Sequence, residues 1–381
     1  MITQPTSGPG LTSPTPFAAS SNAGFFGPAP ISTNGVTIPP ERVRAARDIA
    51  TVLKPGLRVA LTTHVNADGD GLGSEVGLWH LLRARGLHPA IANPTPTPER
   101  FGFLVPEGAD ASAHAVKEIE RADVIMVLDI SDLGRLGDLA HAVRARGGAG
   151  VPVACIDHHV SPGSLPSGPR LVAPEATATA ELVFDFASAL GWELSPESAR
   201  ALYVGLLTDT GGFRFSNTTA RALRVAGALL ERGVDPETIY ERVYASAPEA
   251  RVRLLAEVLQ TLVVEPEVGL AWVTVPPDAL QRYGATPDDL DGIVEFPRTI
   301  AGVRLALLFR QVANGRIKVS LRSMGEVNAA ELAHRFGVGG GGHAKAAGVS
   351  FEGSLAEVQG KVLAAAREYL EGQGGGGASS A

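Results

Sequence analysis

The chain has 381 residues, of which 45% are hydrophobic, and a formal net charge of −7 at pH 7. This length exceeds what one hydrophobic core usually supports, so we expect two domains. The negative charge argues against a protein that holds long nucleic acid or long duplexes, because that function needs an excess of Lys and Arg. The only cysteine, Cys155, excludes an intramolecular disulfide framework and a thiolate metal cage, and it fits a reducing compartment.

Both ends of the chain have the composition of disordered tails. Residues 1–39 are rich in Pro, Ser, Gly and Thr without an apolar period, and residues 372–381 are a Gly/Ser tail. No stretch approaches 18 consecutive apolar residues, and the first 40 residues lack a basic segment followed by an apolar one. We therefore expect a cytoplasmic protein that has no membrane partner.

Short apolar runs alternate with amphipathic stretches from residue 40 to about residue 190. Examples are "RVALTTHV" before "GLGSEVGLWHLLRARG", and "DVIMVLDI" before "LGDLAHAVRARG". This alternation predicts βαβ units and a mostly parallel sheet. Further helices are expected over 193–245, so we predict a first domain over 40–235 followed by a helical linker over 236–254.

A second, smaller α/β domain is predicted over 255–371. It contains the strand "GLAWVTV" and two strands in "VRLALLFRQVANGRIKVSLRS", which Asn314 and Gly315 divide as a hairpin signal. Helical segments are expected at about 327–336 and 355–371, with the glycine-rich "GVGGGGHAKAAG" between them.

Acidic residues and histidines follow the apolar runs of the first domain. They are His64, Asp68 and Asp70 after the first run, Asp129 after the second, Asp157, His158 and His159 at the third, and Asp209 at a helix end. Ligands of open parallel sheets bind outside the carboxyl ends of the strands, so these side chains should converge.

Converging aspartates without a cation would raise one another's pKa values, whereas two divalent ions would cancel four negative charges. Carboxylates with imidazoles and no thiolate favour Mn²⁺, with Mg²⁺, Co²⁺ or Fe²⁺ as alternatives. Two such ions can activate water and clamp the attacking and leaving oxygens at phosphorus. The sequence therefore predicts phosphoester hydrolysis.

Each of these residues alone has an ordinary structural alternative. An Asp at a strand end can cap the next helix, which is the role we expect for Asp132, and Cys155 is expected in the core. Neighbours on a strand point to opposite faces, so His158 and His159 should have different roles. The pattern across four segments is what favours a metal site.

Four motifs resemble those of the DHH phosphoesterases: "HVNADGDGLGS", "LDISD", "IDHH" and "GLLTDTGGFRF". The segments "VSLRS" and "GGGGHAKAAG" resemble the DHH-associated domain, and the likeness covers about 45–370. Within the family the chain is most similar to the NrnA group. The resemblance implies a mostly parallel-sheet DHH domain and a smaller α/β DHH-associated domain, with the active site in the cleft between them.

The resemblance also implies roles for single residues. His64, Asp68 and Asp129 would hold one Mn²⁺, and the other would be held by Asp70, Asp129, His158 and Asp209. Asp157 would orient its neighbours as part of the catalytic machinery. His159 would face the substrate phosphate, where it either stabilises the developing charge or protonates the leaving oxygen.

The second domain offers candidates for substrate binding. Lys318, Ser320 and Arg322 share one face of a predicted strand, which alone would more often be a solvated surface. The glycines before His343, among them Gly341 and Gly342, let backbone N–H groups approach a phosphate, although they could also form only a flexible loop. Arg298 is a weaker candidate for the same site.

The expected function is Mn²⁺-dependent hydrolysis of short 5′-phosphorylated oligonucleotides (nanoRNA, RNA or DNA) and removal of the 3′-phosphate of 3′-phosphoadenosine 5′-phosphate (pAp). A cyclic di-AMP or pApA phosphodiesterase is the alternative. A non-catalytic nucleotide-binding module is disfavoured by the intact ligand set, and a pyrophosphatase by the Gly-His segment. The sequence leaves the oligomeric state open, with a homodimer as one option.

Overall fold

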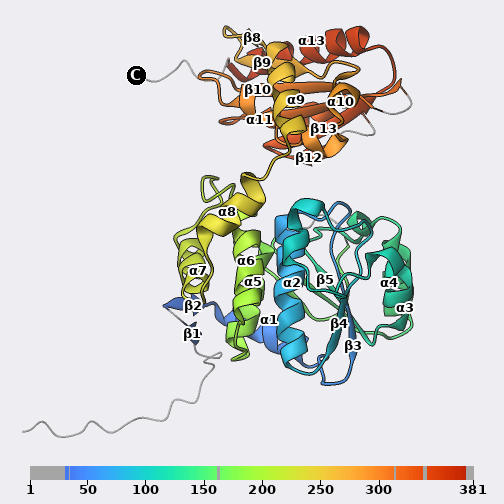
Figure 1. Ribbon diagram of the computed structural model, residues 1–381, viewed down its shortest axis with the longest axis vertical. Helices are drawn as coiled ribbons and strands as arrows, with labels where there is room; N and C mark the ends of the chain where they lie inside the picture. The colour runs from blue at the N-terminus through green and yellow to red at the C-terminus, as the bar shows by residue number, and fades with distance from the viewer. Residues whose placement is uncertain (1–30, 34, 161–163, 313–314, 338–340, 375–381) are drawn as a thin grey trace, which may run out of the picture. The chain divides into compact units, whose positions relative to one another are not determined.

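The computed structural model describes residues 31–33, 35–160, 164–312, 315–337 and 341–374 (Figure 1). The chain divides into two compact units, Met1–Ala245 and Ser246–Ala381. The segment 236–254, expected as a helical linker, is shared between them. Helix α8 (Pro236–Tyr244) buries Ile239 in the first unit, whereas α9 (Glu249–Gln260) buries Leu254 and Val258 in the second.

A five-stranded parallel sheet forms the centre of the first unit, in the order β4-β3-β5-β6-β7. The predicted parallel sheet is therefore confirmed. Its strands are β3 (Arg58–Thr62), β4 (His88–Ile91), β5 (Val124–Leu128), β6 (Val153–Asp157) and β7 (Arg170–Val172). The three central strands alternate between two hydrophobic cores, so helices must cover both faces of the sheet.

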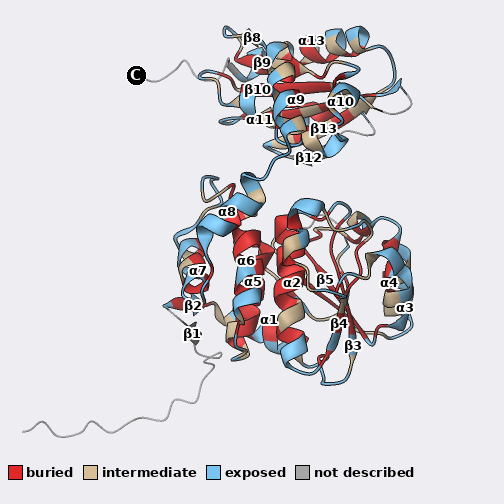
Figure 2. Cartoon of the chain, in the orientation of Figure 1, coloured by how far each residue is buried: buried red, intermediate tan, exposed pale blue. Residues whose placement is uncertain are grey.

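Helices cover the two faces of this sheet unequally (Figure 1). The face with α3 (Ala115–Arg121) and α4 (Leu139–Gly148) has the smaller core. The opposite face carries α1 (Pro40–Ala50), α2 (Gly69–Ala84), α5 (Thr179–Ala189) and α6 (Pro196–Asp209), with α7 (Ala220–Leu230) packed outside them. Figure 2 shows the strands and the inner surfaces of α2 and α6 as buried.

Two glycines bring α2 and α6 unusually close together. A Cβ at Gly73 would lie 2.5 Å from the carbonyl oxygen of Ala201, and one at Gly205 would lie 2.8 Å from Oδ1 of Asp70. Larger residues would force the helices apart. The start of α2 and the end of α6 are thereby held side by side, together with Asp70 and Asp209.

The predicted disorder of residues 1–39 is wrong for residues 31–33 and 35–38. Strands β1 (Ile31–Thr33) and β2 (Val36–Ile38) form an antiparallel pair, in which Val36 and Ile38 are buried in the large core. The V-T-I alternation that produces this pattern is too short to stand out in a Pro-rich context. Residues 1–30 lie outside the described part of the chain.

A buried ion-pair network ties α1 to α5 and α7. The guanidinium of Arg42 donates hydrogen bonds to Glu181 at 3.0 Å and to Asp185 at 2.8 Å, and Arg221 pairs with the same two carboxylates. Arg42 is only 3% exposed. Removing one partner would leave buried charge unpaired, so this network fixes the position of α5.

The second unit contains a six-stranded sheet in the order β12-β13-β11-β10-β9-β8. Among the described strands of this sheet, only the pair β9 and β10 is parallel. The strands are β8 (Val263–Glu265), β9 (Leu270–Thr274), β10 (Leu305–Gln311), β11 (Ile317–Ser323), β12 (Gly341–His343) and β13 (Ala346–Phe351). The antiparallel pair β10 and β11 was expected, although Asn314 of its predicted turn lies outside the described residues.

Helices lie on both faces of this second sheet. One core contains α12 (Ala329–His334) and α13 (Leu355–Gly374), and the other contains α9 and α10 (Ala279–Tyr283). The short helix α11 (Glu295–Arg298) contacts β9, β10 and β11. Because α13 continues to Gly374, the predicted disordered tail is wrong for residues 372–374, and residues 375–381 are outside the described part.

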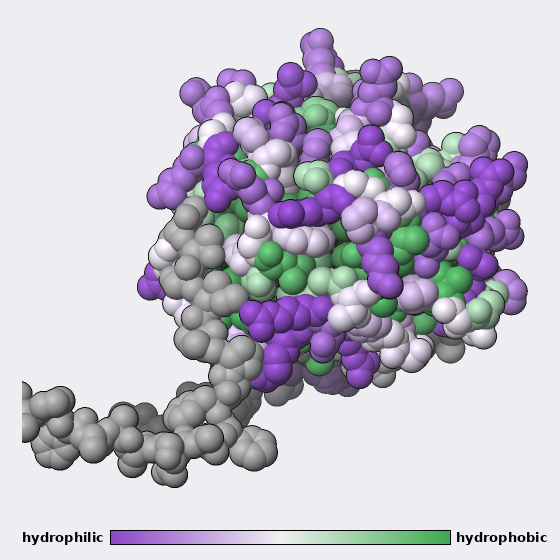
Figure 3. Space-filling view, turned by 90° about the horizontal axis from the view of Figure 1, so that it is seen from below, coloured by the Kyte–Doolittle hydropathy of each residue, from purple (hydrophilic) through white to green (hydrophobic). Residues whose placement is uncertain are grey.

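In the part of the chain that the structure describes, the larger elements are connected by short 3₁₀ helices, among them η1 (Glu99–Leu104), η2 (Ser112–His114), η3 (Leu133–Leu136) and η4 (Pro287–Leu290). Asp132 caps η3 by accepting from the backbone N–H of Gly134, as predicted. Among the described residues, none of the helices is both long enough and apolar enough to span a bilayer. On the face drawn in Figure 3, hydrophilic side chains surround smaller hydrophobic patches, which is ordinary for a solvent-facing surface.

Candidate metal centre

The acidic residues and histidines of the first unit converge at the carboxyl ends of three neighbouring strands. His64 follows β3, Asp129 follows β5, and His158 and His159 follow β6. Asp68 is the N-cap of α2 with Asp70 in its first turn, and Asp209 is the last residue of α6. The convergence expected from a parallel sheet is therefore present.

One group of candidate ligands consists of His64, Asp68 and Asp129. Nε2 of His64 lies 3.7 Å from a carboxylate oxygen of each aspartate, and three ligand atoms of the group lie within 4.8 Å of one another. Nδ1 of His64 lies 2.9 Å from the carbonyl oxygen of Val65, which makes Nδ1 the protonated nitrogen. Nε2 is buried and has no hydrogen-bond partner within the described residues, so its lone pair is available to a cation.

The second group consists of Asp70, His158 and Asp209. Nε2 of His158 lies 3.9 Å from Asp70 and 3.7 Å from Asp209. It also lies 3.6 Å from Oδ1 of Asp129, whereas Oδ2 of Asp129 faces His64 in the first group. Asp129 thus presents one oxygen to each group, which is the arrangement that a ligand shared by two ions requires.

The N-terminus of α5 holds the carboxylate of Asp70 and touches that of Asp129. The backbone N–H groups of Thr179 and Ala180 donate to the two oxygens of Asp70, at 2.6 Å and 2.9 Å. The hydroxyl of Thr179 donates to Oδ1 of Asp129 at 3.0 Å. Helix N-termini stabilise negative charge, so α5 fixes both carboxylates in place.

The turn after β5 has an unusual backbone conformation. Asp129 and Ser131 have φ angles of +55° and +52°, which non-glycine residues rarely adopt. The N–H of Asp129 donates to the carbonyl of Ile156, and that of Ser131 donates to Oδ2 of Asp157. These bonds hold the strained turn in the orientation that directs Asp129 between the two groups.

His158 and His159 lie after β6, so strand alternation does not separate them as the sequence argument assumed. Their rings are 4.6 Å apart, and Nδ1 of His159 lies 3.4 Å from Oδ1 of Asp129. Asp157 separates their roles instead, because its Oδ1 accepts from Nδ1 of His159 at 2.8 Å. Asp157 also accepts from the His159 backbone N–H, so it fixes the orientation of that ring.

The carboxylates of the site have strongly shifted pKa values. Burial and the charges of Asp129 and Asp209 raise the pKa of Asp70 well above its ordinary value. Burial, followed by the charges of Asp129 and Asp68, raises the pKa of Asp209 to about 8. The pKa of Asp129 is also raised, first by burial and then by Asp68. A cluster of carboxylates with raised pKa values binds protons or cations, because these reduce the repulsion between its negative charges.

Two other pKa shifts come from imidazole and carboxylate pairs. Burial lowers the pKa of His64, but its pairing with Asp68 and the charge of Asp129 outweigh burial and raise it. Burial raises the pKa of Asp157, but its pairing with His159 outweighs burial and lowers it. The site therefore combines carboxylates of raised pKa with a histidine, His64, whose pKa is also raised by the neighbouring acids.

The donor atoms fit divalent cations with a preference for oxygen and imidazole ligands. The two groups described above each offer two carboxylates and one imidazole, and a third possible group combines Asp129 with His158 and His159. Nε2 of His64, which has no hydrogen-bond partner among the described residues, lies 3.7 Å from Asp68. The one thiol, that of Cys155, is fully buried among core residues of the sheet. Carboxylate and imidazole ligands without thiolate suit Mn²⁺ or Mg²⁺ better than soft metals.

Several residues at this site were missed by the sequence analysis. Thr179 lies within a run of Ala and Thr that gives no signal. Asn217 donates to the carbonyl of Asp209, and Arg135 lies close enough that its charge slightly opposes the rise in the pKa values of His64 and His159. The sequence offers one indication that Arg135 lies near this site: it follows three residues after Asp132, in the segment that begins with Asp129.

The candidate substrate residues of the second unit lie on and beside β11. Lys318, Ser320 and Arg322 are half-buried and alternate with buried residues, as the strand pattern predicted. Arg322 and Arg298 both bond to the carboxylate of Glu295. The glycine segment was expected to bring backbone N–H groups to a phosphate, with a flexible loop as the alternative. Its residues Gly341–His343 form strand β12, which pairs with β13, and the side chain of His343 lies outside what the structure describes.

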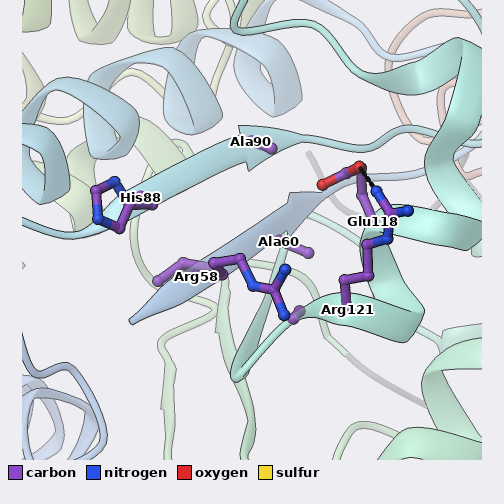
Figure 4. Close-up of a pocket in the computed structure, with 8 residues that line it drawn as sticks. Arg58, Ala60, His88, Ala90, Glu118 and Arg121 are labelled. Carbon is purple, nitrogen blue, oxygen red and sulfur yellow. Dashed lines mark ion pairs between the residues drawn. The ribbon is translucent and has the colours of Figure 1, made fainter. Parts of the chain in front are cut away.

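A pocket of about 180 Å³ lies in the first unit, over the sheet beside α3 (Figure 4). Its lining includes Arg58, His88, Glu118 and Arg121, and Arg121 pairs with Glu118. Arg58 and His88 begin their strands, so the pocket does not reach the carboxyl ends where the aspartates converge. It contributes nothing to the metal centre.

Comparison with known proteins places the chain in a family. Residues 58–206 match the DHH family N-terminal domain, and residues 269–376 match the DHHA1 domain. The bifunctional oligoribonuclease and PAP phosphatase NrnA of Thermus thermophilus is 33% identical over 87% of this chain and 95% of its own length. The Bacillus subtilis protein of the same name is 28% identical over 77% and 88%.

A solved structure agrees with this assignment. The exopolyphosphatase-related protein from Bacteroides fragilis matches with a TM-score of 0.81 and 28% identity, over 87% of this chain and 97% of that one. The order of the two matched domains and the converging aspartates and histidines fit the same assignment. The chain therefore belongs to the DHH family, with a C-terminal DHHA1 domain, and is related to the NrnA proteins.

Proposed function

We propose that the protein is a Mn²⁺-dependent phosphoesterase that hydrolyses short 5′-phosphorylated oligonucleotides to mononucleotides and removes the 3′-phosphate of pAp. The observation that carries this proposal is the position of Asp129, which presents one oxygen to each of two ligand groups. The names of the NrnA relatives support the choice of substrates.

The proposal assigns the residues to two cations. His64, Asp68 and Asp129 would hold one, and Asp70, Asp129, His158 and Asp209 would hold the other. A pair of bound divalent ions supplies Lewis acidity, an activated water and charge compensation for a reaction at phosphorus. Mg²⁺ or Co²⁺ could replace Mn²⁺ in such a ligand set.

In this proposal His159 acts on the substrate, and Asp157 fixes the orientation of the His159 ring. Nδ1 of His159 is bound to Oδ1 of Asp157 at 2.8 Å, so Nε2 is the nitrogen that can face a phosphate. From there the imidazole can stabilise charge on a phosphate oxygen or give a proton to the leaving oxygen. Asp157 is fully buried and fixes the tautomer and the ring orientation.

The second unit would bind the part of the substrate that is not cut. Arg322, Arg298, Lys318, Ser320 and the backbone of Gly341–His343 would contact phosphate, ribose or base. Half-buried cationic and hydroxyl side chains along one strand suit an anionic ligand of a few nucleotides. We propose that the protein acts in the cytoplasm, on single-stranded oligonucleotides and pAp rather than on long duplexes.

Parallel assays of one purified preparation test this function. We expect Mn²⁺-dependent release of mononucleotides from a 5′-phosphorylated dinucleotide and of phosphate from pAp, with slower turnover of cyclic di-AMP. Preferred turnover of the cyclic dinucleotide would favour a cyclic dinucleotide phosphodiesterase. The absence of any turnover, with Mn²⁺ bound, would indicate a non-catalytic nucleotide-binding protein.

A further inference from the structure

Two arginines of the second unit share one carboxylate. Nε of Arg322, on β11, donates to Oε1 of Glu295 at 2.7 Å, and Nε of Arg298, on α11, donates to Oε2 at 2.5 Å. Each carboxylate oxygen thus serves one guanidinium. The result is two cations held on either side of one anion, with a net charge of +1.

The shared carboxylate uses the Nε side of each guanidinium and leaves part of each accessible. Nη1 of Arg322 donates to the carbonyl of Leu321 at 3.0 Å, and Nη1 of Arg298 lies 2.9 Å from Sδ of Met324. Considering only residues that the structure describes, Nη2 of neither arginine donates a hydrogen bond. The side chains of Arg298 and Arg322 are 25% and 29% exposed, so a ligand can reach them.

We propose that Glu295 is a positioning residue, which holds the guanidinium groups of Arg298 and Arg322 together as one binding site for a phosphate of the nucleotide substrate. The identity of the anion rests on the proposed function. Glu295 accepts from the Nε atoms, so the Nη2 hydrogens that point away from its carboxylate are the ones that such a ligand would accept from.

The physical role of Glu295 follows from what its removal would do. Two neighbouring guanidinium groups repel each other when no anion lies between them. Both long side chains would also regain rotamer freedom, and binding would have to restrict them again. The loss should therefore weaken substrate binding, even though it makes the local charge more positive.

The test compares E295A, E295Q and the control E352A. Glu352 is an exposed residue of the same unit without a partner among the described residues, so E352A makes the same charge change away from the arginines. We expect KM for a 5′-phosphorylated pentanucleotide to rise roughly three- to tenfold in E295A, with kcat within about twofold and E352A close to the wild type.

The variant E295Q separates charge pairing from packing. Gln keeps the size of Glu, but it offers one acceptor oxygen and one amide that repels the second guanidinium. We expect E295Q to raise KM as E295A does. A wild-type KM in E295Q, or an unchanged or lower KM in E295A, would overturn the positioning role. An unchanged thermal unfolding midpoint for each variant confirms that it is folded.

A binding measurement distinguishes failure of this inference from failure of the proposed function. The dissociation constant of a 3′-labelled pentanucleotide is measured by fluorescence anisotropy with a chelator present. If the wild type binds without cleaving when Mn²⁺ is added, the proposed function fails, and weaker binding by both Glu295 variants still supports the positioning role. If the wild type does not bind the oligonucleotide with the chelator and does not cleave it when Mn²⁺ is added, both ideas are wrong.

Discussion

The metal-free protein should lose stability as the pH rises from about 5.5 to about 7, and Mn²⁺ should restore it. Asp209 has a pKa of about 8 in the folded protein, against an ordinary value of 3.8. Between these values the folded state holds a proton that the unfolded chain has released. Raising the pH therefore opposes folding throughout this window.

The other titratable groups of the site either also make the protein less stable as the pH rises, or they titrate outside the range from pH 5.5 to 7. The raised pKa values of His64 and His159 also make the folded state bind protons more tightly, so their stabilising effect is lost as the pH rises past the ordinary histidine value. Asp68 and Asp157 have lowered pKa values, so their contribution is lost only at acidic pH. The expected sign is therefore the same across the whole range.

The size of this loss of stability follows from the one proton that Asp209 takes up on folding. Such a proton changes the free energy of unfolding by about 1.4 kcal/mol per pH unit, so Asp209 alone gives about 2 kcal/mol over one and a half units. Its side chain is 28% exposed, and solvent screening reduces the expected value to about 1 kcal/mol. Glu75, which is fully buried and has a pKa of about 8, adds to the same slope.

Urea denaturation at several pH values measures this effect, with a chelator and with Mn²⁺. The variant Asp209→Asn is the matched control, because it removes the titrating group and should flatten the slope. Stabilisation by Mn²⁺ should grow with pH, since the ions displace protons. A free energy of unfolding that stays constant or rises with pH in the chelated protein would refute the reasoning.

Three further substitutions test separate parts of the account. Asp129→Ala removes the carboxylate that faces both ligand groups, so Mn²⁺ binding measured by calorimetry should weaken and turnover should fall about a thousandfold; retained turnover would exclude the shared-ligand role. Asp157→Asn should lower turnover 10- to 100-fold, with Mn²⁺ affinity much less affected; an equal loss of both would place Asp157 in metal binding instead. Arg42→Met leaves Glu181 and Asp185 with one cation fewer, and should reduce the free energy of unfolding by roughly 3 kcal/mol in urea denaturation; an unchanged value would show that the network is dispensable.

The convergence of the ligand residues was predictable because it depends on topology. A parallel sheet brings the carboxyl ends of its strands together, and His64, Asp129 and His158 each follow a short apolar run. The glycine spacing in "GDGLGSEVG" is also visible in the sequence. Its consequence, the close approach of α2 to α6, required the structure because the partner helix is about 130 residues away.

The contacts that hold the ligands could not be read from the sequence. Thr179 binds Asp129 through a tertiary contact across 50 residues, and no local pattern encodes it. The positive φ of Asp129 arises from hydrogen bonds to β6, not from a glycine or asparagine signal. Likewise, the alternation on β11 identified Arg322, but its pairing with Glu295 depends on the fold of the second unit.

Product analysis by mass spectrometry on a 5′-phosphorylated RNA length series, with pAp and cyclic di-AMP included, tests the central claim most directly. With Mn²⁺, the wild type should convert RNAs of two to five nucleotides to mononucleotides and release phosphate from pAp. A chelator or the Asp129→Ala substitution should abolish both activities. No mononucleotide and no phosphate from the Mn²⁺-loaded wild type would contradict the account.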